Sequence, residues 1–117
     1  MQHFKQSHIL NETLRGVTDA DGDLVMETNP FRGGGVLTYE VVACRCAGAQ
    51  AVASIELHGP SVEAGLRTLT LTNANSWYKT RGPVRVPSDW SIRVTFSAGG
   101  DTGLCEASVY GYLAYPE

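Results

Sequence analysis

The sequence has no long apolar run. No stretch approaches the roughly eighteen consecutive apolar residues that a membrane-spanning helix needs. Residues 1–10 also lack the apolar segment of a signal peptide. We therefore expect a protein that is made in the cytosol, stays unprocessed and has no membrane partner.

Basic residues are also scarce. Nine Lys and Arg residues are scattered along 117 positions and the net charge at pH 7 is −3, so we expect no basic surface that would collect phosphate groups. Nucleic acid is accordingly not an expected partner. Charged residues make up 18% of the chain and hydrophobic residues 43%, a balance typical of one folded domain and not of a disordered segment.

Cysteine occurs only three times, and an odd number argues against a framework of disulfides. Cys44 and Cys46 are two residues apart on one expected strand, where both side chains point the same way and a bridge between them would strain the backbone. Cys105 stands alone, so the second pair of a zinc site is missing. We expect reduced thiols in or near the core, and the sequence leaves open whether they oxidise.

The motifs of known catalytic sites are absent as well. His58 is the one plausible base, but the sequence has no Gly-x-Ser-x-Gly elbow and no thiol at a helix N-terminus. The glycines at 33–35 are not followed by the Lys-Ser/Thr of a phosphate loop. We therefore expect no enzyme, with no catalytic, cofactor-binding or metal-binding residues and no cofactor.

An acidic turn is the nearest approach to a metal site. Asp19, Asp21 and Asp23 place three carboxylates at alternate positions. A calcium loop of the EF-hand type needs glycine at its sixth position and glutamate at its twelfth, whereas here Gly22 is fourth and Pro30 is twelfth. The preferred interpretation is a solvated turn, and a Ca²⁺ ion bound there remains the alternative.

What the sequence does contain is alternation with a period of two, which indicates β-strands. Residues 90–96 alternate apolar and polar, and residues 104–115 alternate again after a glycine-rich turn, so we expect an antiparallel hairpin. A second hairpin is expected from strands at 13–17 and 24–28, with Asp21-Gly22 at its tip. The run 36–46 is apolar on both faces in its middle, which is typical of a central strand.

About eight or nine short strands with turn signals between them predict an all-β fold, a single antiparallel β-sandwich. The strand count and the long terminal hairpin favour a jelly roll. An immunoglobulin-like sandwich is the alternative, but its Cys…Trp…Cys arrangement is missing. Residues 1–11 show no clean period and are expected to form an N-terminal arm that lies on its own domain or on a neighbour's. Residues 12–117 are expected to form the single β-sandwich domain.

Aromatic and apolar side chains outside the expected core are candidates for an interface. Tyr110 and Tyr112 share the strand face opposite Val109 and Leu113, and a partner chain is one way to cover them. The Trp77-Tyr78 pair precedes a loop and is expected to present one aromatic ring outward. The complete set of expected interface residues is Phe4, Ile9, Leu10, Trp77, Tyr78, Tyr110 and Tyr112.

The chain is a small acidic β domain with an N-terminal arm and with the stretches WSIRVTF at 90–96 and ASVYGYL at 107–113. In this combination it resembles the jelly-roll decoration or cement proteins of tailed bacteriophage heads. The resemblance is one of architecture, size and texture. It implies a non-enzymatic virion protein that assembles in the host cytoplasm, forms a dimer or trimer, binds the major capsid protein on the capsid surface and bridges capsomers.

A second hypothesis is a carbohydrate-binding or receptor-binding β-sandwich, as in a phage tail or fibre module or a lectin-like domain. In that case Trp77 or Tyr78 would stack on a sugar ring. The acidic turn at 19–23 would be its Ca²⁺ site.

Overall fold

The computed structural model describes residues 4–29, 36–59, 63–80, 84–87, 89–98 and 103–116. Within these residues the chain forms strands and no helix, and no helix there is long and apolar enough to cross a membrane. The nine strands are β1 (Phe4–Val17), β2 (Leu24–Glu27), β3 (Val36–Cys46), β4 (Ala51–His58), β5 (Glu63–Leu71), β6 (Tyr78–Lys79), β7 (Val84–Val86), β8 (Ser91–Ser97) and β9 (Leu104–Pro116).

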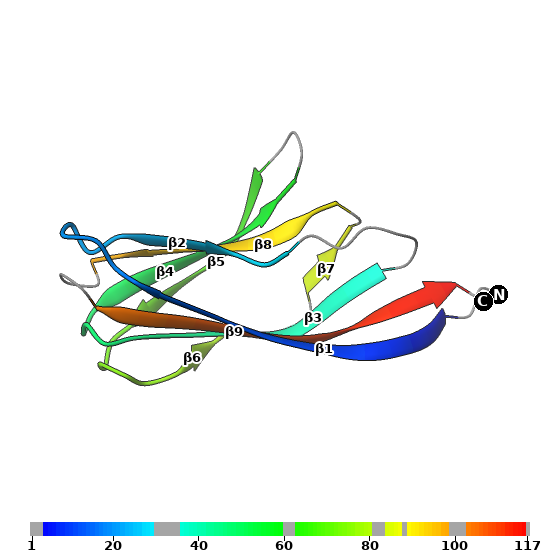
Figure 1. Ribbon diagram of the computed structural model, residues 1–117, viewed down its shortest axis with the longest axis horizontal. Coiled ribbons are helices and arrows are strands. Elements are labelled where there is room, and N and C mark those ends of the chain that lie inside the picture. Colours follow the sequence, from blue (N-terminus) through cyan, green and yellow to red (C-terminus); the bar gives the residue numbers. More distant parts are fainter. Residues whose placement is uncertain are drawn as a thin grey trace.

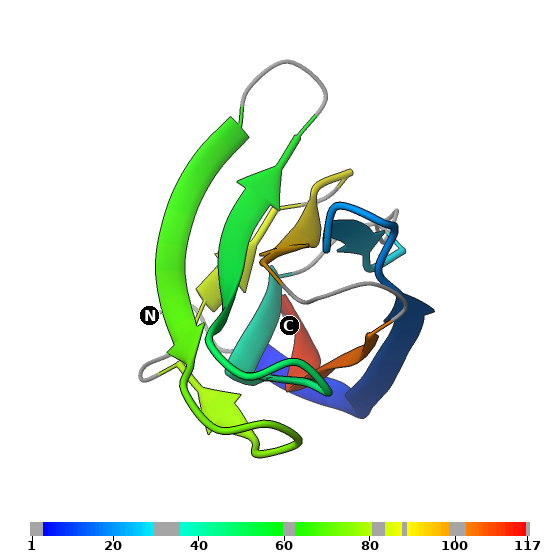
Figure 2. The ribbon, with the colours of Figure 1, turned by 90° about the vertical axis from the view of Figure 1, so that its left-hand side faces the viewer.

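The strands form two sheets that lie one on the other (Figure 1; Figure 2 shows them from one end). The five-stranded sheet has the order β1-β9-β3-β6, with β7 also paired to β3. The four-stranded sheet has the order β2-β8-β4-β5. Every strand pair in both sheets is antiparallel. The fold is therefore an all-β antiparallel sandwich, as the strand patterns predicted.

The order of pairing is that of a jelly roll. The strands can be followed as one long hairpin whose apex is the β4–β5 connection. Its successive strand pairs are β1·β9, β2·β8, β3·β6 with β3·β7, and β4·β5. The further pairs β9·β3 and β8·β4 fold this ribbon into two sheets. This double-sheet wrapping distinguishes a jelly roll from the immunoglobulin-like alternative.

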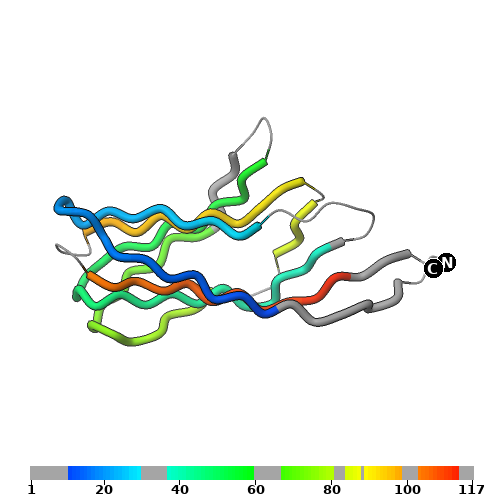
Figure 3. Tube along the Cα trace, viewed as in Figure 1, coloured from blue at the N-terminus to red at the C-terminus, as the bar shows by residue number. Residues whose placement is uncertain are grey.

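Both expected hairpins are wrong. β8 pairs with β2 and β4, whereas β9 pairs with β1 and β3, so the glycine-rich link 98–103 passes from one sheet to the other. The link between β1 and β2 also crosses between the layers, as the chain path in Figure 3 shows. Alternation identifies the buried face of a strand but not its neighbour, and two consecutive strands can meet across the core as well as along an edge.

β3 is a central strand, as predicted, but its inward face changes partway along. Leu37 and Tyr39 are buried in its first part. The register with β9 shifts between Tyr39 and Val41, and after this bulge the buried side chains are Val42, Cys44 and Cys46. One extra residue moves the following side chains to the opposite face. A single alternating pattern therefore does not describe the whole of β3.

Gly111 lies opposite this bulge. A Cβ atom built on Gly111 would lie 2.0 Å from the carbonyl oxygen of Thr38 and 2.7 Å from the Cα atom of Tyr39. Both are backbone atoms, so no rotamer change would relieve the contact. Glycine is needed here because the β3 backbone approaches β9 too closely for any side chain.

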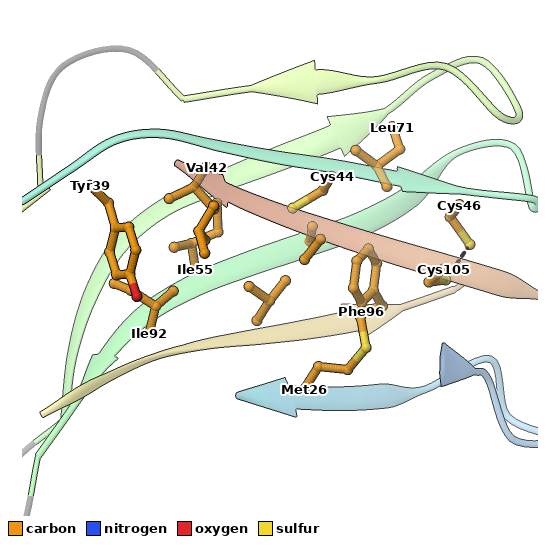
Figure 4. Close-up of a cluster of buried hydrophobic side chains, with 14 of the residues drawn as sticks. Met26, Tyr39, Val42, Cys44, Cys46, Ile55, Leu71, Ile92, Phe96 and Cys105 are labelled. Atoms are coloured by element: carbon orange, nitrogen blue, oxygen red, sulfur yellow. Dashed lines mark hydrogen bonds between the residues drawn. The ribbon is translucent and has the colours of Figure 1, made fainter. Parts of the chain in front are cut away.

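The core lies between the two sheets, and Figure 4 shows its larger side chains pointing toward one another. From β9 the buried residues of the core are Cys105, Ala107, Val109 and Leu113. From β4 they are Ala51, Ala53 and Ile55, with Leu57 partly buried. These inward faces confirm the alternation read from the sequence. Trp90 is partly buried against the core, also as expected from its phase.

The first eleven residues were expected to form an N-terminal arm that lies on its own domain or on a neighbour's. Residues 4–11 belong to β1, which continues without interruption to Val17. Their backbone pairs with β9 from Phe4 opposite Pro116 to Asn11 opposite Tyr110, with one irregularity between Gln6 and His8. This segment therefore lies on its own domain, along β9.

Candidate interaction surface

The outward side of the five-stranded sheet carries three of the residues that the sequence singled out: Trp77, Tyr110 and Tyr112. Because Cys105, Ala107, Val109 and Leu113 point into the core, the even-numbered residues of β9 from Glu106 to Tyr112 point outward. Side chains directly opposite on antiparallel strands share a face. The register therefore adds residues from β1 and β3 to this outer face: Asn11, Thr13, Arg15, Val41, Ala43 and Arg45.

Tyr110 lies near the middle of this outer face. Its partners in the register are Asn11 on β1 and Val41 on β3. Its side chain is 41% exposed, although β9 is flanked on both sides, by β1 and by β3. Tyr112, two residues further along β9, is partly buried. The prediction that both tyrosines lie opposite Val109 and Leu113 is confirmed; what covers them stays a prediction.

Trp77 is the second exposed aromatic residue on this side of the sheet. It directly precedes β6, where Tyr78 pairs with Cys44, so it lies beside Arg45 of β3. The Trp77 side chain is 45% exposed. The guanidinium carbon of Arg45 lies 4.9 Å from the centroid of the ring, a cation–π contact that holds the indole on the sheet.

Tyr78 takes the opposite direction. Its ring packs against the core, and its hydroxyl oxygen accepts a hydrogen bond of 3.0 Å from the backbone N–H of Asn73. The prediction that one ring of the pair points outward is therefore confirmed, and that ring is Trp77. Tyr78 stabilises the turn that precedes it.

Glu106 lies buried at one end of the outer face, in line with Arg15 and Arg45 on the flanking strands. Its side chain is only 4% exposed. Arg15 Nε donates to Glu106 Oε2 at 3.0 Å, and Arg45 Nε donates to Glu106 Oε1 at 2.8 Å. Arg45 Nη2 also donates to Oε1. These hydrogen bonds, first those of Arg45 and then that of Arg15, lower the pKa of the Glu106 carboxyl below its ordinary value.

The carboxylate and the two arginines form a fixed ionic row across three strands. The Arg15 side chain remains 70% exposed and that of Arg45 35% exposed, whereas the Glu106 side chain is 4% exposed. Sequence reasoning missed this row because its members are 61 and 91 positions apart. The signal available in the sequence was Glu106, the charged residue of the strand 104–115. Its ion-pair partners follow only from the strand order.

Neither the models of known protein families nor the curated protein sequences give a match to this chain.

Phe4, Ile9 and Leu10 were also expected at the interface. The backbone register places Ile9 opposite Tyr112 and Leu10 opposite Gly111. The side chains of these three residues lie outside the described part of the structure. Their part of the prediction is a position along β1, next to the tyrosine-bearing end of the outer face.

His58, the only base that the sequence offered, lies on the outward side of the other sheet. Its Nε2 atom is 3.0 Å from Arg93 Nη2, and Arg93 Nε donates to Glu27 Oε1 at 3.2 Å. A guanidinium has only donors, so in this contact the imidazole nitrogen accepts. Engaged in this way, Nε2 is not available to remove a proton from a nucleophile.

The acidic turn at 19–23 is held by hydrogen bonds within the turn. Asp19 Oδ1 accepts hydrogen bonds from the backbone N–H groups of Asp21 at 2.9 Å and Asp23 at 3.0 Å. In the described part of the chain no group of three or more His, Cys, Asp or Glu residues is placed to hold a metal ion. The structure thus gives Asp19 a role as the cap of its own turn.

Proposed function

We propose that this protein is a non-enzymatic virion protein, a decoration protein that binds the major capsid protein on the outside of a bacteriophage head and bridges capsomers. The outer face of the five-stranded sheet is the binding surface in this proposal. The jelly-roll fold supports it, because such sheets present broad rigid faces. The resemblance to head decoration proteins in architecture, size and texture is its second support.

The observation that carries the proposal is the exposure of Tyr110 and Trp77 on a rigid sheet. Aromatic side chains that are held in place and only half covered are the commonest anchors of protein interfaces. Val41 and Ala43 lie near Tyr110 on β3 and are partly buried, so they add apolar side chains on that side of the ring. The Glu106 row keeps the neighbouring strands in register beneath Trp77.

The shape of the molecule suits a bridging role. Its principal extents are 50 × 28 × 19 Å, so the domain is long and thin and presents a large face for its volume. A protein present in many copies on a particle needs only modest affinity at each contact, because several linked contacts reinforce one another. A dimer or trimer, as expected here, would add such contacts.

A co-sedimentation assay tests this proposal. Purified protein is mixed with expanded heads assembled from the major capsid protein of the same viral genome, and the pelleted fraction is measured by quantitative gel. We expect saturable binding that Tyr110→Ser and Trp77→Ser each weaken. Val25→Ser is the matched control, because Val25 is 58% exposed on the outward side of the other sheet. Absence of wild-type binding, or equal loss in the control, contradicts the proposal.

Glycan binding is the second candidate function, and the exposed Trp77 ring is the observation that favours it. The Arg45 guanidinium already occupies one face of that ring, which leaves the other face for a sugar. A glycan screen distinguishes the two candidates. Binding that Trp77→Ser abolishes and Tyr110→Ser leaves unchanged would support the glycan-binding function over the capsid function.

A further inference from the structure

Two of the three cysteines face each other in the core, on neighbouring strands. Cys46 of β3 and Cys105 of β9 are direct partners in the register, and both are fully buried. Their Sγ atoms are 2.7 Å apart, well inside the contact distance of two unbonded sulfur atoms, and Figure 4 shows the two side chains pointing toward each other. No disulfide joins them in this structure.

The backbone register favours a bond at this position. The N–H of Ala47 donates to the carbonyl of Leu104 at 2.8 Å, so Ala47 and Leu104 form a hydrogen-bonded pair of the antiparallel ladder. The next pair, Cys46 with Cys105, is therefore a non-hydrogen-bonded pair, in which Cα atoms are typically about 4.5 Å apart and side chains are closest. That separation lies within the range of about 4.4–6.8 Å that disulfides span.

Cys44 differs from this pair although it lies on the same inward face of β3. Its partner in the register is Ala107, so no thiol stands opposite it. The three thiols also do not form a metal site, because no cluster of metal-binding side chains is found among the described residues. Cys44 is therefore a natural internal control for Cys46.

We infer that Cys46 and Cys105 form a cross-strand disulfide that locks β3 to β9 when the chain folds in the presence of a small-molecule disulfide such as oxidised glutathione. One thiolate attacks a glutathione sulfur and releases one glutathione thiolate. The second cysteine thiolate then attacks the mixed disulfide and releases the other. The two cysteines lose two protons and two electrons, and one oxidised glutathione becomes two reduced glutathiones. This inference does not depend on the proposed function.

The reaction belongs to the folding stage. Burial raises the pKa of the Cys105 thiol, and the hydrogen bond with Cys46 raises it further. Thiolate is the reactive form, and both sulfur atoms are covered in the folded domain. The folded, reduced protein should therefore oxidise far more slowly than a chain that is refolding, in which both thiols are exposed.

The test refolds the full chain from denaturant with oxidised and reduced glutathione, and in parallel with reductant alone. After acid quenching, free thiols are alkylated under denaturing conditions and counted by intact mass. We expect one alkylated cysteine after oxidative refolding and three after reductive refolding. Peptide mapping without reduction should join Cys46 to Cys105 and leave Cys44 alkylated. Three alkylated thiols after oxidative refolding, or a bond that includes Cys44, overturns the inference.

Two variants complete the experiment. Cys44→Ala should still form the cross-link, and Cys105→Ala should not. The thermal midpoint of oxidised wild type and oxidised Cys44→Ala should fall when reductant is added, whereas that of Cys105→Ala should be unaffected. An equal response to reductant in all three proteins overturns the inference. The wild-type peptide map decides the question even if a variant fails to fold.

Discussion

Replacing Arg45 by methionine tests the central electrostatic feature of the fold. Methionine keeps much of the length and apolar area of the arginine side chain but removes its guanidinium. Glu106, 4% exposed, then keeps only the contact with Arg15. Breaking one side of a buried ion pair costs about 3–5 kcal/mol. Arg45 is itself 35% exposed and Arg15 remains, so we expect a loss of about 2–3 kcal/mol.

A domain of this size has a free energy of unfolding of about 5–15 kcal/mol, so the Arg45→Met variant should stay folded. Urea unfolding at pH 7, followed by far-ultraviolet circular dichroism, should show the midpoint lowered by about 1–3 M for an m-value of about 1–2 kcal/mol/M. Tryptophan fluorescence is a poor probe of stability here, because the substitution also removes the cation–π contact with Trp77. Arg85→Met is the matched control: Arg85 is an exposed arginine on the same sheet, and its replacement should cost less than about 0.5 kcal/mol.

The double variant Arg45→Met/Glu106→Leu separates two explanations of the loss. If the cost arises from leaving a buried carboxylate poorly compensated, removing the carboxylate as well should recover at least about half of it. Arg15, 70% exposed, needs no partner. A double variant less stable than Arg45→Met, or a single variant within about 0.5 kcal/mol of wild type, would refute the description of Glu106 as a buried, paired charge.

Three further predictions follow from the same geometry. The pKa of Glu106 is lower in the folded state than its ordinary value of 4.5. The contribution of its carboxylate to stability is therefore complete above pH 4.5 and is lost as the pH falls through the folded pKa. Acid titration of the free energy of unfolding should show this loss in wild type and not in Glu106→Gln. Gly111→Ala should destabilise by about 3 kcal/mol or more in urea unfolding. In Gly16→Ala the new Cβ would meet the ends of two flexible side chains, Leu24 at 2.9 Å and the Met26 sulfur at 3.3 Å, so this variant should cost under about 1 kcal/mol. Equal costs would contradict the backbone approach at the bulge. In the head-binding assay Tyr110→Ser should raise the apparent Kd about tenfold or more, and an effect no larger than that of Val25→Ser would remove Tyr110 from the interface.

The inward face of a strand could be predicted from the sequence where the alternation of apolar and polar residues is unbroken. The alternation at 104–115 placed Cys105, Ala107, Val109 and Leu113 inward, and all four are buried. The number of strands then favoured a jelly roll. These inferences needed only the side-chain period of a strand, which is a local property.

Strand neighbours could not be predicted in the same way. The glycine-rich link at 98–103 has the composition of a hairpin turn, yet it joins two sheets. The bulge near Glu40 has no local signal, and it reverses which side chains of β3 face inward. The ionic row of Arg15, Glu106 and Arg45 depends on both features, because its members meet only through the register of three strands. The Trp77 and Tyr110 positions were anticipated as single residues, but their common face was not.

The pairing of the two ends of the chain has a mechanical consequence. Phe4 lies opposite Pro116, and from there β1 and β9 run as one antiparallel ladder into the body of the domain. A force applied between the two ends would break the hydrogen-bonded pairs of that ladder one after another, instead of shearing many hydrogen bonds at once. Resistance to stretching along the chain is therefore low. A load on this molecule is better transmitted through the faces of its two sheets, where all the inter-strand hydrogen bonds share it.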